Sequence, residues 1–132
     1  GEDEQMLKQM AYNLGVAESI IFAGQQKDMD PFYRKASFFC MSSRFEGLPM
    51  VLLEAQSYGL PIVSFDCNTG PAELIDNRVN GFLAEVENID DLSLKILQLC
   101  KEDNFEDFFK CAFEKNLKFN MSNIVAKWTN VI

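Results

Sequence analysis

The chain has 132 residues, a length that suits one domain or part of a larger one. Its composition, 48% hydrophobic and 24% charged, is typical of a soluble globular protein, and its apolar runs are too short to span a membrane. The net charge of -8 argues against a nucleic-acid backbone as the main partner. A small phosphate ligand bound by backbone amides remains compatible with an acidic chain.

The cysteines give no sign of a metal site or a disulfide framework. The four cysteines include no CxxC pair, and the sequence contains no histidine. Zinc binding and a secreted disulfide scaffold are therefore both disfavoured. We expect buried free thiols in a reducing cytoplasm. The cysteines are Cys40, Cys67, Cys100 and Cys111.

Helix and strand signals alternate along the first two thirds of the chain. Residues 5–14 predict a helix closed by Gly15, and residues 19–22 predict a short buried strand. Asp30 and Pro31 are typical of a helix start, here for residues 31–36. The later elements predicted are strands over 38–41, 61–65 and 81–85, and helices over 49–58 and 72–75.

The last third predicts helices only. Apolar residues at helical spacing indicate amphipathic helices over residues 89–99 and 105–113, and a final helix over 124–131. We expect the phenylalanines of residues 105–113 to belong to the core. Strands alternating with helices predict an α/β fold, with a Rossmann-like parallel sheet, flanking helices and right-handed crossovers.

Three longer polar loops follow predicted strands, over residues 24–27, 42–49 and 66–70. In an open parallel sheet, ligands bind outside the carboxyl ends of the strands, which is where these loops lie. The connections on the opposite side are tight. This asymmetry indicates that the carboxyl edge is the functional edge.

The middle loop carries the strongest sequence signal for a binding site. Gly47 allows a close approach of the backbone to a ligand, and Pro49 begins a helix. The amides of residues 50–52 then point out of the helix start. Together with the helix dipole, these amides suit a diphosphate.

Two carboxylates lie beside this predicted anion site. Glu54 is one turn into the helix, and helical side chains lean toward the N-terminus, so its carboxylate can reach a ligand bound there. Glu46 precedes the helix at the same mouth. Both carboxylates are compatible with a phosphate ligand if they accept hydrogen bonds from sugar and ribose hydroxyls. The alternative is that both are ordinary solvated carboxylates.

Residues 46–63, EGLPMVLLEAQSYGLPIV, resemble the signature E-G-x-P-x-V-x-x-E-A-x-x-x-G-x-P-V-V. This signature belongs to the C-terminal domain of family 4 glycosyltransferases, which have the GT-B fold. Shorter elements resemble other motifs of this family. They are G-D-G-x at residues 1–4, F-x-G at 22–24, Y-x-x-A at 33–36, G-x-x-E-I/L at 70–75 and N-G-x-L at 80–83.

The resemblance implies roles for individual residues. Glu54 would bind the ribose hydroxyls, and the amides near Met50 and Val51 would hold the diphosphate. Glu46 would orient the donor sugar at the catalytic position, with a role as nucleophile as the alternative. The sugar would also contact Gly47 and Leu48. Gln25 would lie near the base, and Arg44 is one of two nearby cations, with Lys27 the other.

The resemblance also implies an activity for a parent enzyme. That enzyme would transfer a sugar from a nucleoside-diphosphate sugar, here a UDP-sugar, to a glycan or lipid-linked acceptor. Configuration at the anomeric carbon would be retained, and no metal would be needed. The family's usual setting is surface-polysaccharide assembly in the cytoplasm, with peripheral association at the inner face of the membrane.

Relative to the family pattern, residues 1–132 are a partial donor domain without the N-terminal acceptor domain. The first two strands of the C-terminal domain, with their phosphate-binding cations, are also absent. In the strand order 3-2-1-4-5-6, residues 19–22 form strand 3 and residues 38–41 form strand 4. We expect another chain, or residues upstream, to fill the space between them, in preference to direct pairing.

A second class of function stays open, namely a doubly wound nucleotide- or protein-binding module without catalysis. A receiver domain would need an acidic cluster after the first strand and a late lysine, and neither is evident. A nicotinamide-binding domain would need G-x-G-x-x-G, which the sequence lacks.

Overall fold

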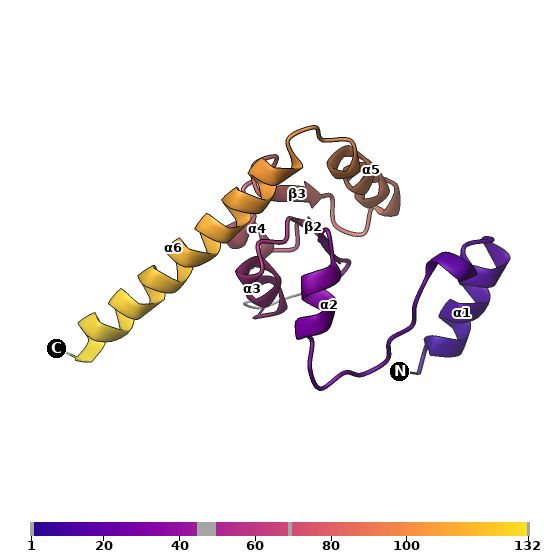
Figure 1. Cartoon of the computed structure of the whole chain (residues 1–132), viewed down its shortest axis with the longest axis horizontal. Coiled ribbons are helices and arrows are strands. Elements are labelled where there is room, and N and C mark those ends of the chain that lie inside the picture. The colour runs from indigo at the N-terminus through magenta and orange to yellow at the C-terminus, as the bar shows by residue number, and fades with distance from the viewer. Residues whose placement is uncertain (1, 45–49, 69, 132) are drawn as a thin grey trace. The chain divides into compact units, whose positions relative to one another are not determined.

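The computed structural model describes the backbone of residues 2–44, 50–68 and 70–131, and side chains as far as residue 119 (Figure 1). The chain forms two compact units, Gly1–Pro31 and Phe32–Ile132. Among the described residues, no helix combines the length and the apolar character needed to cross a membrane.

The N-terminal unit consists of α1 (Glu4–Asn13), a short 3-10 helix η1 (Ala17–Ser19) and an irregular segment that follows it. α1 ends where Gly15 adopts a φ of 73°, a left-handed conformation that glycine reaches at little cost. The helix buries Ala11 and leaves Met10 half exposed. The predicted helix over residues 5–14 is therefore confirmed.

The predicted buried strand over residues 19–22 is wrong for this structure. Ser19 ends η1, and the residues after it form no strand, with 89% of Ile21 exposed. β-Branched residues favour a strand only when a neighbour pairs with its backbone groups and covers one face. The direct pairing of residues 19–22 with residues 38–41 is accordingly not part of the sheet.

The second unit contains a parallel sheet with the strand order β1-β2-β3. Phe39 pairs with Ile62, and Ile62 pairs in turn with Gly81. This sheet confirms the α/β class. Its strands are β1 (Phe39–Met41), β2 (Ile62–Phe65) and β3 (Gly81–Ala84).

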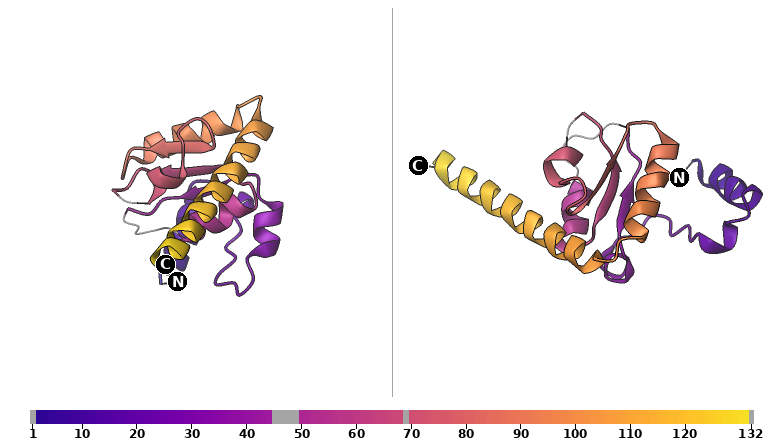
Figure 2. Two further views of the ribbon diagram at one scale, coloured as in Figure 1. Left: turned by 90° about the vertical axis from the view of Figure 1, so that its left-hand side faces the viewer. Right: turned by 90° about the horizontal axis from the view of Figure 1, so that it is seen from above.

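Helices cover both faces of this sheet (Figure 2). On one face, α5 packs around Val63 and Phe82. On the other face, α3 and α4 pack around Ile62, and Phe119 of α6 joins them. The helices of this unit are α3 (Met50–Ser57), α4 (Pro71–Leu74), α5 (Ile89–Cys100), α6 (Phe105–Val131) and all but the first two residues of α2 (Asp30–Lys35).

The C-terminal region departs from the expected two helices. α6 is a single helix of 27 residues, and it includes both predicted segments, 105–113 and 124–131. The residues between them contain no glycine or proline, so nothing in the backbone chemistry ends the helix there. Phe108 is buried as expected, whereas Phe109 and Phe113 are almost half exposed.

The expectation of uniformly buried thiols is also wrong. Cys67 is buried, but Cys40 and Cys100 are exposed and Cys111 is half-buried. Cys40 lies in β1 at the edge of the sheet, where successive residues are half-buried, exposed and buried. The strand alternation therefore turns its side chain away from the core.

Candidate functional site

The three parallel strands of the second unit all end at the same edge of the sheet. Residues 42–44 follow β1, residues 66–68 follow β2, and residues 85–88 follow β3. Two of the three loops predicted to line a ligand site, 42–49 and 66–70, begin on this carboxyl edge. The third, over residues 24–27, belongs to the N-terminal unit.

The described part of α3 begins at Met50, directly after Pro49, where the sequence predicts the helix to start and which lies outside the described residues. The first amides of a helix have no acceptor within it, so those of residues 50–52 are the donors that the helix start offers. Met50 is 68% exposed, whereas Val51 packs against the core. The predicted site residues Glu46, Gly47 and Leu48 lie outside the described residues.

Glu54 lies on the exposed face of α3, one turn after Met50. The Tyr33 hydroxyl donates a hydrogen bond to its Oε2 over 3.2 Å. Tyr33 belongs to α2 and is only 4% exposed. Burial, followed by the negative charge of Glu54, raises the pKa of Tyr33 to about 12, so this hydroxyl keeps its proton at neutral pH.

Aromatic packing fixes the ring that carries this hydroxyl. Tyr33 stacks on Tyr58 with 5.1 Å between ring centroids, and it contacts Phe39 at 6.3 Å. The Arg34 guanidinium lies 5.8 Å from the Tyr58 ring centroid. Sequence reasoning missed the contact between Tyr33 and Glu54. The available signal was the Y-x-x-A element, which identified Tyr33 without indicating its partner.

Buried amide side chains tie α3 to its neighbours. Gln56 and Asn80 both donate to the Leu74 carbonyl, over 2.8 and 3.0 Å. Asn116 of α6 donates to the Leu53 carbonyl over 2.8 Å. The bonds of Gln56 and Asn116 hold the helix that carries Glu54 against α4 and α6, and the bond of Asn80 ties α4 to the start of β3.

Arg44 extends from the loop after β1, and its Nε lies 3.4 Å from Oε1 of Glu87. The two side chains are 70% and 59% exposed. Glu87 follows β3 and has a left-handed φ of 62°. Sequence reasoning singled out Arg44 but not Glu87. The pair brings two loops of the carboxyl edge together.

The third loop leads into α4, a helix of four residues. Gly70 has a φ of 101°, and the Glu73 amide donates to its carbonyl over 3.0 Å. Glu73 itself is exposed. The hydrogen bond closes a tight turn at the start of this short helix.

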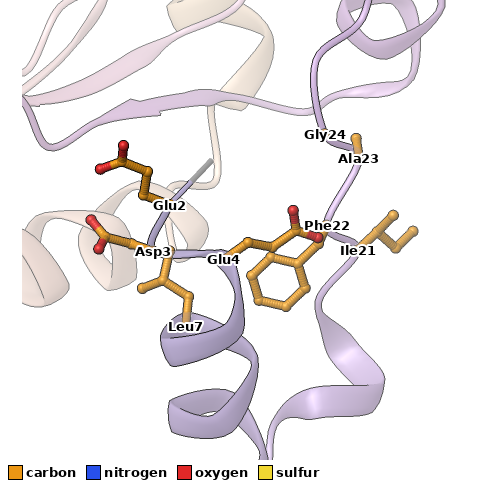
Figure 3. Close-up of a pocket in the computed structure, with 8 residues that line it drawn as sticks. All are labelled: Glu2, Asp3, Glu4, Leu7, Ile21, Phe22, Ala23 and Gly24. Carbon is orange, nitrogen blue, oxygen red and sulfur yellow. The ribbon is translucent and has the colours of Figure 1, made fainter.

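The N-terminal unit contains a cavity of about 410 Å³ between the start of α1 and the segment before Gln25. Figure 3 shows Glu4 reaching toward Phe22, while the carboxylates of Glu2 and Asp3 point away from that ring. Lys8 lies 2.7 Å from Glu4 and 5.8 Å from the Phe22 ring centroid. The cavity therefore brings together two of the quoted elements, residues 2–4 and 22–24. Gln25 follows them and is exposed.

Within the described ranges, no group of three or more histidine, cysteine, aspartate or glutamate side chains could hold a metal ion. The described polar groups at the carboxyl edge include the backbone amides at the start of α3, the Glu54 carboxylate with its tyrosine donor, and Arg44 paired with Glu87. Such a set can bind an anion and neutral hydroxyls.

The sequence and the fold are similar to those of known proteins. Residues 1–115 match the model of a family described as Glycosyl transferases group 1. An uncharacterized glycosyltransferase of Haemophilus influenzae is 33% identical, over 100% of this chain and 38% of its own length. The amylovoran biosynthesis glycosyltransferase AmsD of Erwinia amylovora is 30% identical, over 100% of this chain and 37% of its own length.

The fold of this chain is also similar to that of a solved structure. A variant of S. aureus TarM, in complex with Fondaparinux, alpha-GlcNAc-glycerol and UDP, matches with a TM-score of 0.86 and 26% identity. The match covers 97% of this chain and 26% of TarM. The chain thus spans less than two fifths of the length of these proteins. Its sequence and its α/β architecture place it in the group 1 family of glycosyl transferases.

Proposed function

We propose that this chain is the donor-binding part of a retaining glycosyltransferase of the family 4 type, and that its donor is a UDP-sugar. The observation that carries the proposal is the placement of Glu54. Its carboxylate lies on the exposed face of α3, bound to Tyr33, one turn from a helix start at the carboxyl edge of the sheet.

The start of α3 binds the diphosphate in this proposal. Amides at a helix start donate hydrogen bonds, and the helix dipole adds positive potential there. Glu54 accepts hydrogen bonds from the ribose hydroxyls, which are neutral and therefore suit a carboxylate beside an anion. Met50 and Val51 contribute their backbone amides to the diphosphate site. The Val51 side chain packs against the core and does not face the ligand.

Arg44 stabilises the charge that develops on the leaving diphosphate. Its guanidinium pairs with Glu87 at the same edge, and because both side chains are more than half exposed, Arg44 can exchange that partner for a ligand. These groups neutralise the diphosphate without a metal. Glu46 orients the donor sugar, and Gly47 and Leu48 contact it, roles that rest on the resemblance alone.

Gln25 contacts the base through its amide, also by the resemblance. The residues just before Gln25 line a cavity of the N-terminal unit, whose lining also includes the acidic residues Glu2, Asp3 and Glu4. Glu4 pairs with Lys8, and the role given to Gln25 rests on the resemblance alone.

The whole protein transfers the sugar to a glycan or lipid-linked acceptor in this proposal. Support comes from AmsD, which is named for amylovoran biosynthesis, and from TarM, whose structure holds UDP and alpha-GlcNAc-glycerol. Such an enzyme acts in the cytoplasm, at the inner face of the membrane.

Calorimetric titration of the chain with UDP, GDP and NAD tests the nucleotide-binding part of the proposal. We expect UDP to bind, and Glu54→Ala to weaken its binding by about 1–3 kcal/mol, the usual effect of losing a hydrogen bond to a charged group. Ser57→Ala is the matched control, because the Ser57 hydroxyl donates to the Glu54 backbone carbonyl and not to its carboxylate. Unchanged UDP affinity in Glu54→Ala would contradict the proposal.

A further inference from the structure

We propose that Tyr33 is a positioning residue for the nucleotide, because its hydroxyl holds the Glu54 carboxylate in the orientation that receives the ribose hydroxyls. The inference rests on the proposed function, since it assumes that Glu54 binds the ribose. It adds a residue from a different helix, α2, to the nucleotide site on α3.

The two partners differ in burial. Glu54 is exposed and has three rotatable side-chain bonds, so it would sample several rotamers if left alone. Tyr33 is buried, stacked on Tyr58 and packed with Ala55 and Leu60. The packed ring therefore holds the Tyr33 hydroxyl in place, and the exposed Glu54 carboxylate accepts a hydrogen bond from it over 3.2 Å.

The chemistry of the donor matters as much as its position. A lysine or arginine at this place would neutralise the carboxylate and weaken it as an acceptor. The neutral hydroxyl of Tyr33 contributes one proton to Oε2 and leaves the negative charge in place. Oε1 and the second lone pair of Oε2 can then accept hydrogen bonds from two adjacent ribose hydroxyls.

Among the contacts of Tyr33, the hydroxyl makes the hydrogen bond to Glu54, and the ring makes the aromatic contacts. The ring alone supplies the stacking on Tyr58 and the contact with Phe39. Phenylalanine would keep those contacts and lose the hydrogen bond. Tyr33→Phe therefore separates positioning from packing.

The test is calorimetric titration of the whole 132-residue chain with UDP, and with a UDP analogue whose ribose lacks both hydroxyls. We expect Tyr33→Phe to weaken UDP binding about 2- to 10-fold, the range for a single lost hydrogen bond. The thermal midpoint should stay close to that of the wild type. The analogue should bind the two proteins equally. Tyr12→Phe is the matched control, because Tyr12 is 73% exposed on α1.

A double-mutant cycle completes the test. In a Glu54→Ala background, Tyr33→Phe should have no further effect on UDP binding, because the group that it positions is gone. An equal loss in both backgrounds, or no loss in the wild-type background, overturns the positioning role while Glu54→Ala still reports on the proposed function. A wild-type chain that binds no UDP overturns both.

Discussion

Arg44 and Glu87 form an ion pair between two loops that leave the same edge of the sheet. Both side chains are more than half exposed, so water screens the pair and little free energy is needed to separate it. A diphosphate bound at the start of α3 would present a stronger and more concentrated negative charge than one carboxylate. Glu87 and the ligand therefore compete for Arg44.

This competition predicts opposite effects for the two partners. Glu87→Gln should tighten UDP binding about 2-fold at low ionic strength, whereas Arg44→Ala should weaken it about 2- to 5-fold, magnitudes typical of exposed charge pairs. Calorimetry at low and high salt measures both, and the differences should shrink as salt is added. Glu114→Gln, an equal charge change on the exposed side of α6, is the control. A Glu87→Gln effect no larger than the control's would exclude the competition.

At the scale of single residues, the sequence singled out Glu54 and Arg44 as candidates but did not predict their contacts with Tyr33 and Glu87. The position of Glu54 relative to the start of α3 could be predicted because both lie on one helix, whose geometry determines the distance between them. Tyr33 is 21 residues away from Glu54 in the chain, and only the packing of α2 beside α3 brings the two together. Pairings of this kind leave no periodic pattern in a sequence.

Among the elements, β3 depends on a close approach to β2 at Gly81. A Cβ atom built on Gly81 would collide with the backbone carbonyl of Ile62, which cannot move without disturbing the strand pairing. The residue before it, Asn80, is buried and donates to the Leu74 carbonyl. The N-G pair therefore joins α4 to the sheet.

Replacing this glycine should destabilise the second unit. We expect Gly81→Ala to lower the free energy of unfolding by at least about 2 kcal/mol, because the clash involves backbone atoms. Urea denaturation followed by circular dichroism measures the change. Ser93→Ala, on the exposed side of α5, should stay within about 0.5 kcal/mol of the wild type. If both variants unfold at the same urea concentration, the close approach is relaxed at little cost.

The start of α5 makes the stability of this element dependent on pH. Asn88 caps the helix by accepting from the Asp91 amide, and the Asp91 carboxylate accepts from the Glu85 amide over 2.7 Å. The bond from Glu85, supported by Lys95, holds the pKa of Asp91 below its ordinary value of 3.8. A lowered pKa means that the stabilisation is present above the ordinary value and is lost as pH falls through the folded-state value.

Asp91→Asn should therefore have a lower thermal midpoint than the wild type at neutral pH. The gap should close as the pH falls below 3.8, where Asp91 of the wild type becomes protonated as well. Calorimetric melting over a pH series measures this. Asp90→Asn, a neighbouring exposed carboxylate on the same helix turn, is the control. A gap that stays constant with pH would assign the effect to something other than ionisation.

For the whole molecule, binding and transfer are separable. We expect the 132-residue chain to transfer no labelled sugar, because it spans less than two fifths of the length of the relatives that it matches. In the complete protein, Glu46→Gln should lower kcat more than it lowers affinity for UDP, since Glu46 is assigned to the sugar. Steady-state kinetics with a UDP-sugar donor measures both constants. Transfer by the short chain, or wild-type kcat in Glu46→Gln, would contradict this division.

The sequence by itself determined the α/β class, the three paired strands and the helix that carries Glu54. These features depend on local periodicity and on helix-start chemistry, both of which a short window of residues contains. The same local rules misjudged residues 19–22, which have strand-like composition but form no strand in this structure.

Only the tertiary structure decided which groups meet across the fold. Tyr33 reaches Glu54, Arg44 reaches Glu87, and Asn116 reaches the carbonyl of Leu53, 63 residues away. The physical reason is that such contacts depend on the docking of helices and loops against the sheet. Docking follows from the burial of many side chains at once, and no single stretch of the chain encodes it.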